Sequence, residues 1–292
     1  MSRRRSPRIA FSTAGAPPEE ASISTFTTLT LDAADRVAVL TFNRPNVLNA
    51  FDGTLVDECA EALRAAVTND AVSAIVVRGA GRAFSAGFDL KAGAATAGQR
   101  NLAEWRKVLE ADFDFIMQFW HCPKPTIAAV HGYCLGGAFE LALACDVTVA
   151  AHSTRFGAPE VKFGSGAVAL LLPWVAGPKA AKELLLTGDD HLTAERALAL
   201  GIVNHVVPDG EEMDRALAIA RSIASAAPGA VRMTKLAINR SFDTMGLRDS
   251  LAAALELCIY VEAAGGSERA EFDRIRRDQG LNAALEWRDR RR

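Results

Sequence analysis

The order of apolar and polar residues predicts a pair of short strands where regular structure begins. From Phe26, apolar and polar side chains alternate over residues 26–43, and the polar run DAAD interrupts the alternation. A period of two is typical of a strand with one buried face, and a polar interruption is typical of a turn. We therefore expect two strands that are joined by a turn near residues 32–35.

Alternating helices and strands follow once Pro45 ends this pattern. Apolar residues recur at helical spacing in two long segments, whereas three short apolar runs have the length of buried strands. The helices are expected at 54–69 and 102–120, and the strands at 71–79, 124–132 and 147–151. Strand–helix alternation of this kind predicts an α/β fold.

Helices replace strands in the last third of the chain. From about residue 209 the apolar spacing is helical, and one stripe in it is too apolar for a free surface. That stripe consists of Leu247, Leu251, Leu255, Cys258 and Ile259. We expect an α/β core over 26–208 and a helical region over 209–292 that packs on the core or on a neighbouring subunit.

The first 25 residues differ from the rest of the chain. They hold four arginines before the first acidic residue, Glu19, and they show little periodicity. An Arg- and Ser-rich leader is compatible with a transit peptide, but no amphipathic helix is visible. We therefore interpret residues 1–25 as a disordered arm.

The composition excludes several classes of protein. Half of the 292 residues are hydrophobic, and the net charge of −2 provides no general attraction to nucleic acid. The five cysteines include no CxxC pair, which predicts reduced thiols rather than disulfides or a zinc site. The most apolar window, 167–177, is too short for a membrane span. A cytoplasmic protein without a metal and without nucleic-acid or membrane partners is expected.

Common nucleotide and hydrolase motifs are absent. The segment GAGRAF has Phe84 where a dinucleotide-binding loop requires its third glycine. The chain also contains no GxxxxGK[ST] and no GxSxG. The sequence therefore gives no motif-based support for a nicotinamide-dependent dehydrogenase, a P-loop nucleotide-binding protein or a serine hydrolase.

Two glycine-rich turns each follow a predicted strand. The first turn is GRAFSAGFDL, residues 81–90, and the second is HGYCLGGAFE, residues 131–140. Gly136 and Gly137 leave bare backbone at the start of a helix, whose positive end favours an anion. N–H groups from both turns would form an oxyanion hole, although an ordinary helix start remains an alternative.

Two glutamates near these turns are candidates for acid–base chemistry. Glu140 follows Gly137 by three positions, and Glu160 follows Pro159 in the segment FGAPEVKFG. Taken alone, Glu140 reads as a carboxylate that complements a helix dipole, and Glu160 reads as a turn carboxylate. If both face one cleft, their repulsion raises one pKa and provides one acid and one base.

Five segments together resemble the enoyl-CoA hydratase/isomerase (crotonase) superfamily. They are NRPNVLNAF, GAGRAFSAGFDL, KPTIAAVHGYCLGGAFELALACDVTVAA, FGAPEVKFG and LLLTGDDHLTAERALALGIVNHVV, and the resemblance spans about residues 26–275. It implies a spiral core of ββα units, with a C-terminal helical region that serves in trimerisation. It also implies an acyl-CoA substrate, no separate cofactor, and a homotrimer or homohexamer.

The resemblance assigns roles to particular residues. The backbone N–H groups of Phe88 and Gly137 match the oxyanion hole, with Gly136 beside it. Glu140 and Glu160 match the two glutamates of hydratases, which add water to a 2-enoyl-CoA. Double-bond isomerisation and hydration coupled to carbon–carbon cleavage are alternatives within the superfamily.

Contacts to coenzyme A are also implied by the resemblance. They match Val47, Leu48 and the backbone of Phe88, Asp89, Leu90 and Lys91, with Asp89 itself structural. Asn46 replaces a frequent lysine, and Arg276 or Arg277 could approach the CoA phosphates. An RNA-binding branch of the superfamily is an alternative, but acids are interleaved among the C-terminal arginines and no aromatic residues are interleaved in a basic stretch.

One loop departs from the hydratase pattern. Residues 164–170 read GSGAVAL, so that Val168 and Leu170 stand where hydratases have glycines. We therefore expect the side chains of Val168 and Leu170 to line the acyl pocket and to change the range of substrates.

Overall fold

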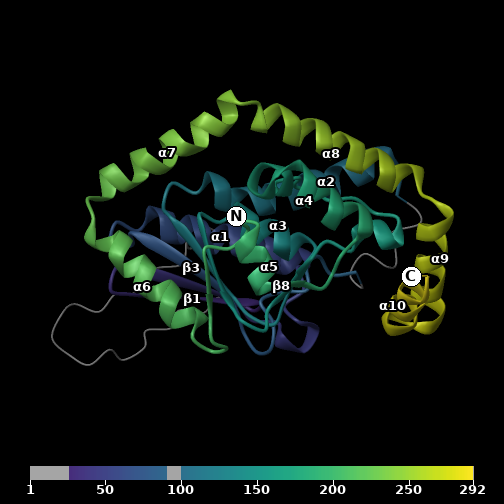
Figure 1. Cartoon of the computed structure of the whole chain (residues 1–292), viewed down its shortest axis with the longest axis horizontal. Coiled ribbons are helices and arrows are strands. Elements are labelled where there is room, and N and C mark those ends of the chain that lie inside the picture. The colour runs from purple at the N-terminus through teal and green to yellow at the C-terminus, as the bar shows by residue number, and fades with distance from the viewer. Residues whose placement is uncertain (1–25, 91–99, 292) are drawn as a thin grey trace, which may run out of the picture.

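A six-stranded sheet forms the centre of the structure, a computed structural model that describes residues 26–90 and 100–291 (Figure 1). In spatial order its strands are β1 (Leu29–Ala34), β2 (Val37–Phe42), β3 (Ala74–Gly79), β4 (Thr126–Val130), β6 (Val147–Ala151) and β9 (His205–Val207). Only the first pair is antiparallel; the following pairs are parallel. The carboxyl ends of β3 and β4 therefore lie at one edge, where open α/β sheets place ligands.

The antiparallel pair confirms the predicted hairpin. Asp35 and Arg36 join β1 to β2, and both have positive φ angles, 50° and 65°. Positive φ at both central residues is typical of a type I′ turn, whose twist matches that of the flanking strands. The resulting register pairs Leu31 with Leu40, and both side chains are buried.

A smaller sheet lies beside the turns that the sequence singles out. Its strands are β5 (Tyr133–Leu135), β7 (Arg155–Gly157) and β8 (Leu192–Thr193), of which β5 and β7 are parallel. Ser85, in the loop after β3, forms a bridge with Cys134 of β5. This bridge brings the first glycine-rich turn alongside the second one.

Helices cover both faces of the large sheet. On one face, Ala216 and Ala220 of α6 (Glu212–Ser225) pack on side chains such as Val76 and Ile127. On the other face lie α1 (Gly53–Thr68), α2 (Leu102–His121) and α3 (Gly137–Ala144). The core between these helices and the sheet holds fully buried phenylalanines: Phe42, Phe84, Phe119 and Phe139.

Four further helical elements lie in the connections between strands. They are η1 (Pro45–Val47), η3 (Glu160–Phe163), α4 (Leu172–Thr187) and α5 (Ala194–Ala199). Gly177 has a φ of 77° and precedes Pro178, so that α4 is kinked at this pair.

The C-terminal region is helical, as predicted, and consists of α7 (Pro228–Thr244), α8 (Leu247–Ala264), α9 (Ser267–Gln279) and α10 (Leu281–Arg290). Figure 1 shows α7 and α8 as an arc over the core, which leads from α6 to the yellow α9–α10 pair. The apolar stripe on α8 is buried in the core of its own chain. The stripe therefore does not by itself require a neighbouring subunit, and oligomerisation stays a prediction.

The Arg-rich segment 1–25 and the candidate CoA-binding residue Lys91 lie outside the described residues. Within residues 26–90 and 100–291, no helix has both the length and the apolar character needed to cross a membrane.

Candidate active site

The two glycine-rich turns meet at the carboxyl ends of β3 and β4. The Ser85 N–H donates to the Tyr133 carbonyl at 3.0 Å, and the Leu135 N–H donates to the Ser85 carbonyl at 3.2 Å. A Cβ atom at Gly87, whose φ is +85°, would lie 3.1 Å from the Gly137 nitrogen. Only glycine allows the two backbones to come this close, so the structure brings together the turns that the sequence predicts.

Two backbone N–H groups in these turns have no acceptor within the described part of the chain. The Phe51 N–H donates to the Gly87 carbonyl and the Asp89 N–H donates to the Phe51 carbonyl, both at 2.9 Å, so that this ladder skips the Phe88 N–H. Gly137 is the first residue of α3, where an N–H has no partner inside the helix. Both groups can therefore donate to a bound oxyanion, which the positive end of α3 also favours.

Glu140 is a buried carboxylate, not a solvated one. Its Oε1 accepts a hydrogen bond from the Val168 N–H at 2.9 Å, and its Oε2 accepts one from the Ala169 N–H at 3.0 Å. Only 5% of the residue is exposed. Burial, followed by the charge of Glu160, raises the pKa of Glu140 to about 8, although the two N–H donors oppose this change.

Glu160 lies against the second glycine-rich turn. It is the first residue of η3, and a Cβ atom at Gly136 would lie 2.8 Å from its Oε1. Its Oε2 is buried and has no hydrogen-bond partner among the described residues. Burial raises the pKa of Glu160 to about 7. The structure thus brings Glu140, Glu160 and Gly136 together, as the sequence predicts.

A third carboxyl group, Asp112 in α2, adds negative charge to the surroundings of Glu140. Burial raises the pKa of Asp112 to about 7, while Arg100 lowers it and Glu262 raises it. The sequence analysis missed this residue, because a single acid in an amphipathic helix has the same pattern as a solvated surface residue.

The candidate CoA-binding residues lie beside the first turn. Val47 and Leu48 end η1, and the Leu48 carbonyl accepts the Ala86 N–H at 2.9 Å. Asn49, which sequence reasoning missed, is fully buried, and its side-chain amide donates to the Ala80 and Ala83 carbonyls at 2.8 Å. This single side chain therefore fixes η1 to the first turn.

Charged groups surround the end of this segment. Arg44 forms an ion pair of 3.3 Å with Asp89, which agrees with a structural role for that carboxylate. Arg276 is buried, donates to the Leu90 carbonyl, and lies 2.8 Å from Asp273. Arg277 is exposed.

The loop after Glu160 places its two unusual side chains in different surroundings. Val168 is buried and packs in the main core, and only its backbone contacts Glu140. Leu170 instead lines a groove of about 340 Å³ together with Glu160, Ala167, Leu185 and other residues. Of the two side chains expected in the acyl pocket, Leu170 therefore lines this groove, whereas Val168 lies in the core.

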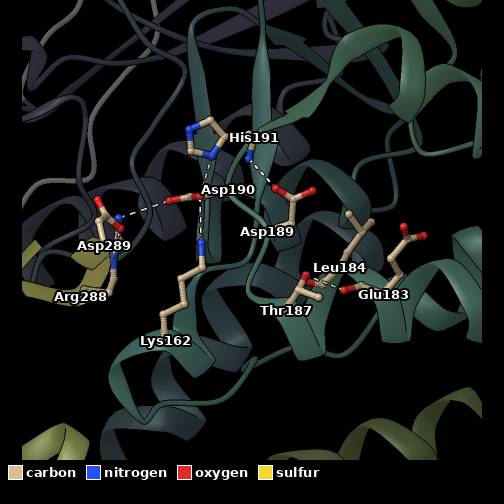
Figure 2. Close-up of polar contacts among 9 residues, drawn as sticks. All are labelled: Lys162, Glu183, Leu184, Thr187, Asp189, Asp190, His191, Arg288 and Asp289. Atoms are coloured by element: carbon tan, nitrogen blue, oxygen red, sulfur yellow. Dashed lines mark hydrogen bonds and ion pairs between the residues drawn. The ribbon is translucent and has the colours of Figure 1, made fainter. Parts of the chain in front are cut away.

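The cluster Asp189–Asp190–His191 has three possible metal ligands within reach of one another. Figure 2 shows that Asp190 already faces three side chains. Its Oδ1 lies 3.0 Å from the Lys162 Nζ and 2.7 Å from the His191 Nδ1, and its Oδ2 lies 3.2 Å from an Arg288 nitrogen. The neighbouring cations satisfy this carboxylate and disfavour a metal cation, so we interpret the cluster as structural.

Comparisons with known proteins agree with this geometry. The family model "Enoyl-CoA hydratase/isomerase" matches residues 32–269. The chain is 36% identical to the short-chain-enoyl-CoA hydratase of Clostridium acetobutylicum, over 72% of this chain and 80% of the relative. It is 35% identical to the 2,3-dehydroadipyl-CoA hydratase of Escherichia coli, over 80% of this chain and 90% of the relative.

A solved structure of an enoyl-CoA hydratase/isomerase from Xanthobacter autotrophicus Py2 has a similar fold. It superposes with a TM-score of 0.90 at 47% identity, and the alignment covers 92% of this chain and 99% of that one. These matches confirm the predicted crotonase-like α/β core. The chain belongs to the enoyl-CoA hydratase/isomerase family.

Proposed function

We propose that the protein adds water across the double bond of a 2-enoyl-CoA thioester and forms a 3-hydroxyacyl-CoA. The observation that carries this proposal is the pair of buried carboxyl groups, Glu140 and Glu160, beside two N–H groups that can hold an oxyanion. The names of the relatives support hydration of CoA thioesters. The reaction is a reversible addition without net oxidation, so the residues of this chain suffice without a separate cofactor.

The oxyanion forms on the thioester oxygen. As water attacks C3, charge moves from the double bond to this oxygen, and the N–H groups of Phe88 and Gly137 stabilise it. Such preorganised donors act on charge that develops in the transition state, and loss of one donor costs about 10²–10³-fold in rate. C2 then takes up a proton, and the carbonyl re-forms.

The two carboxyl groups divide the proton transfers. Glu140, with two N–H donors that stabilise its anion, accepts a proton from the attacking water. Glu160, whose Oε2 has no donor within the described chain, is the protonated member and delivers its proton to C2. Burial is the main cause of the higher pKa of Glu140, and the charge of an ionised Glu160 adds to it; the second contribution vanishes when Glu160 carries the proton. One proton must then return from Glu140 to Glu160 before the next turnover.

The acyl chain beyond C3 extends into the groove that begins at Glu160. The groove is lined by apolar side chains such as Leu170, Pro173 and Leu185, apart from Glu160 itself and Lys182. An apolar acyl group gains about 25 cal/mol for each Å² that it buries there. We therefore include a preference for apolar acyl chains in the proposal.

We further propose that the protein forms a homotrimer or homohexamer and is located in the cytoplasm. Large apolar side chains remain exposed on α7, on α8 and between these two helices, and a subunit interface would cover them. They include Met233, Ile238, Met245, Leu257 and Tyr260, of which Leu257 and Tyr260 are each 68% exposed.

A panel of acyl-CoA thioesters tests the proposed reaction. Incubation with 2-enoyl-CoAs of increasing chain length, followed by mass spectrometry, should show a gain in mass of one water. The 3-hydroxyacyl-CoA products should revert to the same equilibrium mixture. Interconversion of 2-enoyl- and 3-enoyl-CoA without any gain of water would overturn hydration and support double-bond isomerisation.

A further inference from the structure

The helices α9 and α10 pack on both segments that carry the proposed active site. The ring of Phe272 in α9 stacks on Phe163 of η3 with a centroid distance of 5.1 Å. Leu90, two residues after Phe88, packs in the same apolar cluster, and its carbonyl accepts a hydrogen bond from Arg276. The C-terminal helices therefore contact the segment of Glu160 and the segment of Phe88 at once.

A chain of ion pairs connects α10 to η3 as well. Asp190 lies between Lys162 of η3 and Arg288 of α10, at 3.0 Å and 3.2 Å (Figure 2). The three side chains are only 9%, 16% and 10% exposed, in the order Asp190, Lys162 and Arg288. Such poorly solvated charges are screened less than surface charges, so loss of the central carboxylate would leave two cations that repel each other.

The backbone at Asp190 packs against the segment that precedes Glu160, and this segment in turn contacts Gly136. A Cβ atom at Gly157 would lie 2.3 Å from the Asp190 Cα, so the two backbones are in direct contact. The Ala158 N–H donates to the Asp189 carbonyl at 3.0 Å, and the Gly157 carbonyl accepts the Gly136 N–H at 2.8 Å. A displacement of this segment would therefore reach Gly136 as well as Glu160.

The element that carries Glu160 depends on such external support. η3 is a 3₁₀ helix of four residues, too short to be stable on its own. The Glu160 Oε2 has no hydrogen-bond partner in the described chain that would fix the side chain directly. The direction of Glu160 is therefore set by what holds η3, and Lys162 of η3 forms an ion pair with Asp190.

We propose that Asp190 is a positioning residue of the active site, which joins Lys162 to Arg288 and thereby lets α10 hold Glu160 in its working orientation. This inference rests on the proposed function, because it assigns Glu160 a part in the reaction. Asp190 itself does not contact the reacting atoms. Its effect passes through Lys162 and the backbone of η3.

The first test replaces each of the two aspartates that contact Arg288 by asparagine, one at a time. Asp190→Asn should lower kcat by about ten- to a hundredfold, as expected for a small displacement of a reacting group, with KM unchanged within about twofold. Asp289→Asn is the matched control, because Asp289 also contacts Arg288, at 2.9 Å, but is 44% exposed, whereas the ion pair of Lys162 is with Asp190. It should leave kcat unchanged. Equal losses in both variants, or a full kcat in Asp190→Asn, would overturn the proposal.

The second test repeats Asp190→Asn in a Glu160→Gln background. If Asp190 acts through Glu160, the residual rate of Glu160→Gln should not fall further. A decrease of kcat by the same factor in both backgrounds would show a general structural effect and overturn the positioning role. Full activity of Glu160→Gln alone would instead overturn the proposed function, so the two failures are distinguishable. If Asp190→Asn does not fold, Arg288→Gln serves in its place, with thermal unfolding measured for each variant.

Discussion

The backbone N–H of Val168 lies 2.9 Å from the Oε1 of Glu140 and donates a hydrogen bond to it. The neighbouring Ala169 N–H occupies the other carboxylate oxygen at 3.0 Å. Both contacts use the main chain, so they do not depend on which side chains the loop carries. A loop with valine and leucine in place of glycines can therefore still hold this carboxylate, provided that its backbone keeps the same course.

Removal of the carboxylates tests their assignment directly. Glu140→Gln and Glu160→Gln should each reduce kcat by about 10²–10⁴-fold, which is the usual contribution of general acid–base catalysis. The double variant should lose far less than the product of the two losses, because the residues act as a unit. Steady-state kinetics with one 2-enoyl-CoA measures all three. Near-complete activity in either single variant would refute the assignment.

Gly136 offers a test that separates backbone strain from chemistry. It has a φ of +57°, and a Cβ there would lie 2.8 Å from the Glu160 Oε1. Its ψ of −130° lies outside the left-handed helical region, so Gly136→Ala should lower the free energy of unfolding by more than the about 1–2 kcal/mol typical of that region. It should also displace Glu160, with a loss of kcat of about tenfold or more.

Gly201 provides the matched control for this substitution. It has a φ of +74°, and no atom lies within 4 Å of the position that its Cβ would take. Gly201→Ala should also lower the stability in chemical denaturation, but with an unchanged kcat. If both alanine variants keep full activity, the catalytic position of the Glu160 side chain does not depend on the missing Cβ atom at Gly136.

The sequence predicts the main features of the site because they follow from local rules. Strands 71–79 and 124–132 are recognised by short apolar runs, and parallel strands bring their carboxyl ends to one edge of a sheet. The glycine-rich turns that follow these strands are therefore expected to lie close together. The position of Glu140, three residues after Gly137, then places it in the first turn of a helix beside them.

Other parts of the site could not be found in this way. Lys162 and Asp190 are 28 residues apart, and Asp190 and Arg288 are 98 residues apart, so no local pattern links them. The sequence also shows which residues occupy the loop after Glu160, but not that Val168 points into the core and Leu170 into the groove. That difference depends on backbone dihedral angles, which the tertiary packing decides.

The raised pKa values of the glutamates predict how activity and stability depend on pH. Activity requires one proton on the pair, so kcat/KM should follow a bell-shaped curve that falls when both groups are protonated and when both are ionised. Burial raises the pKa of Glu160 from 4.5 to about 7, so the folded state binds more protons than the unfolded state between these values. The free energy of unfolding should therefore decrease as the pH rises through this range.

Glu160→Gln removes this titration and provides the comparison. Its free energy of unfolding should vary less between pH 4.5 and pH 7 than that of the wild type, as measured by urea denaturation at a series of pH values. An identical pH dependence in both proteins would show that Glu160 titrates normally in the folded state.

The exposed apolar side chains of α8 predict the behaviour of the subunits. Light scattering should show a trimer or hexamer for the wild type. Leu257→Asp, at a position that is 68% exposed, should dissociate the assembly, because it would place an unpaired charge in a desolvated interface. Leu102→Asp, at a position on α2 that is 53% exposed, serves as the control and should leave the assembly intact. A monomeric wild type at micromolar concentration would contradict the proposed oligomer.

The two unusual side chains of the loop after Glu160 should have separable effects. Leu170 lines the groove that begins at Glu160, so Leu170→Ala should enlarge it and favour longer or branched acyl chains over crotonyl-CoA. One methylene group in such a pocket changes the discrimination between two substrates by about 1–3 kcal/mol, so the ratio of kcat/KM values for the two substrates should shift by about tenfold or more.

Val168 is buried in the core, and Val168→Ala should instead lower the stability by about 1 kcal/mol and leave that ratio unchanged. Kinetics with crotonyl-CoA and a medium-chain 2-enoyl-CoA would measure both effects. A substrate shift in Val168→Ala but not in Leu170→Ala would show that the acyl chain takes another path, past the core side of the loop rather than through the groove.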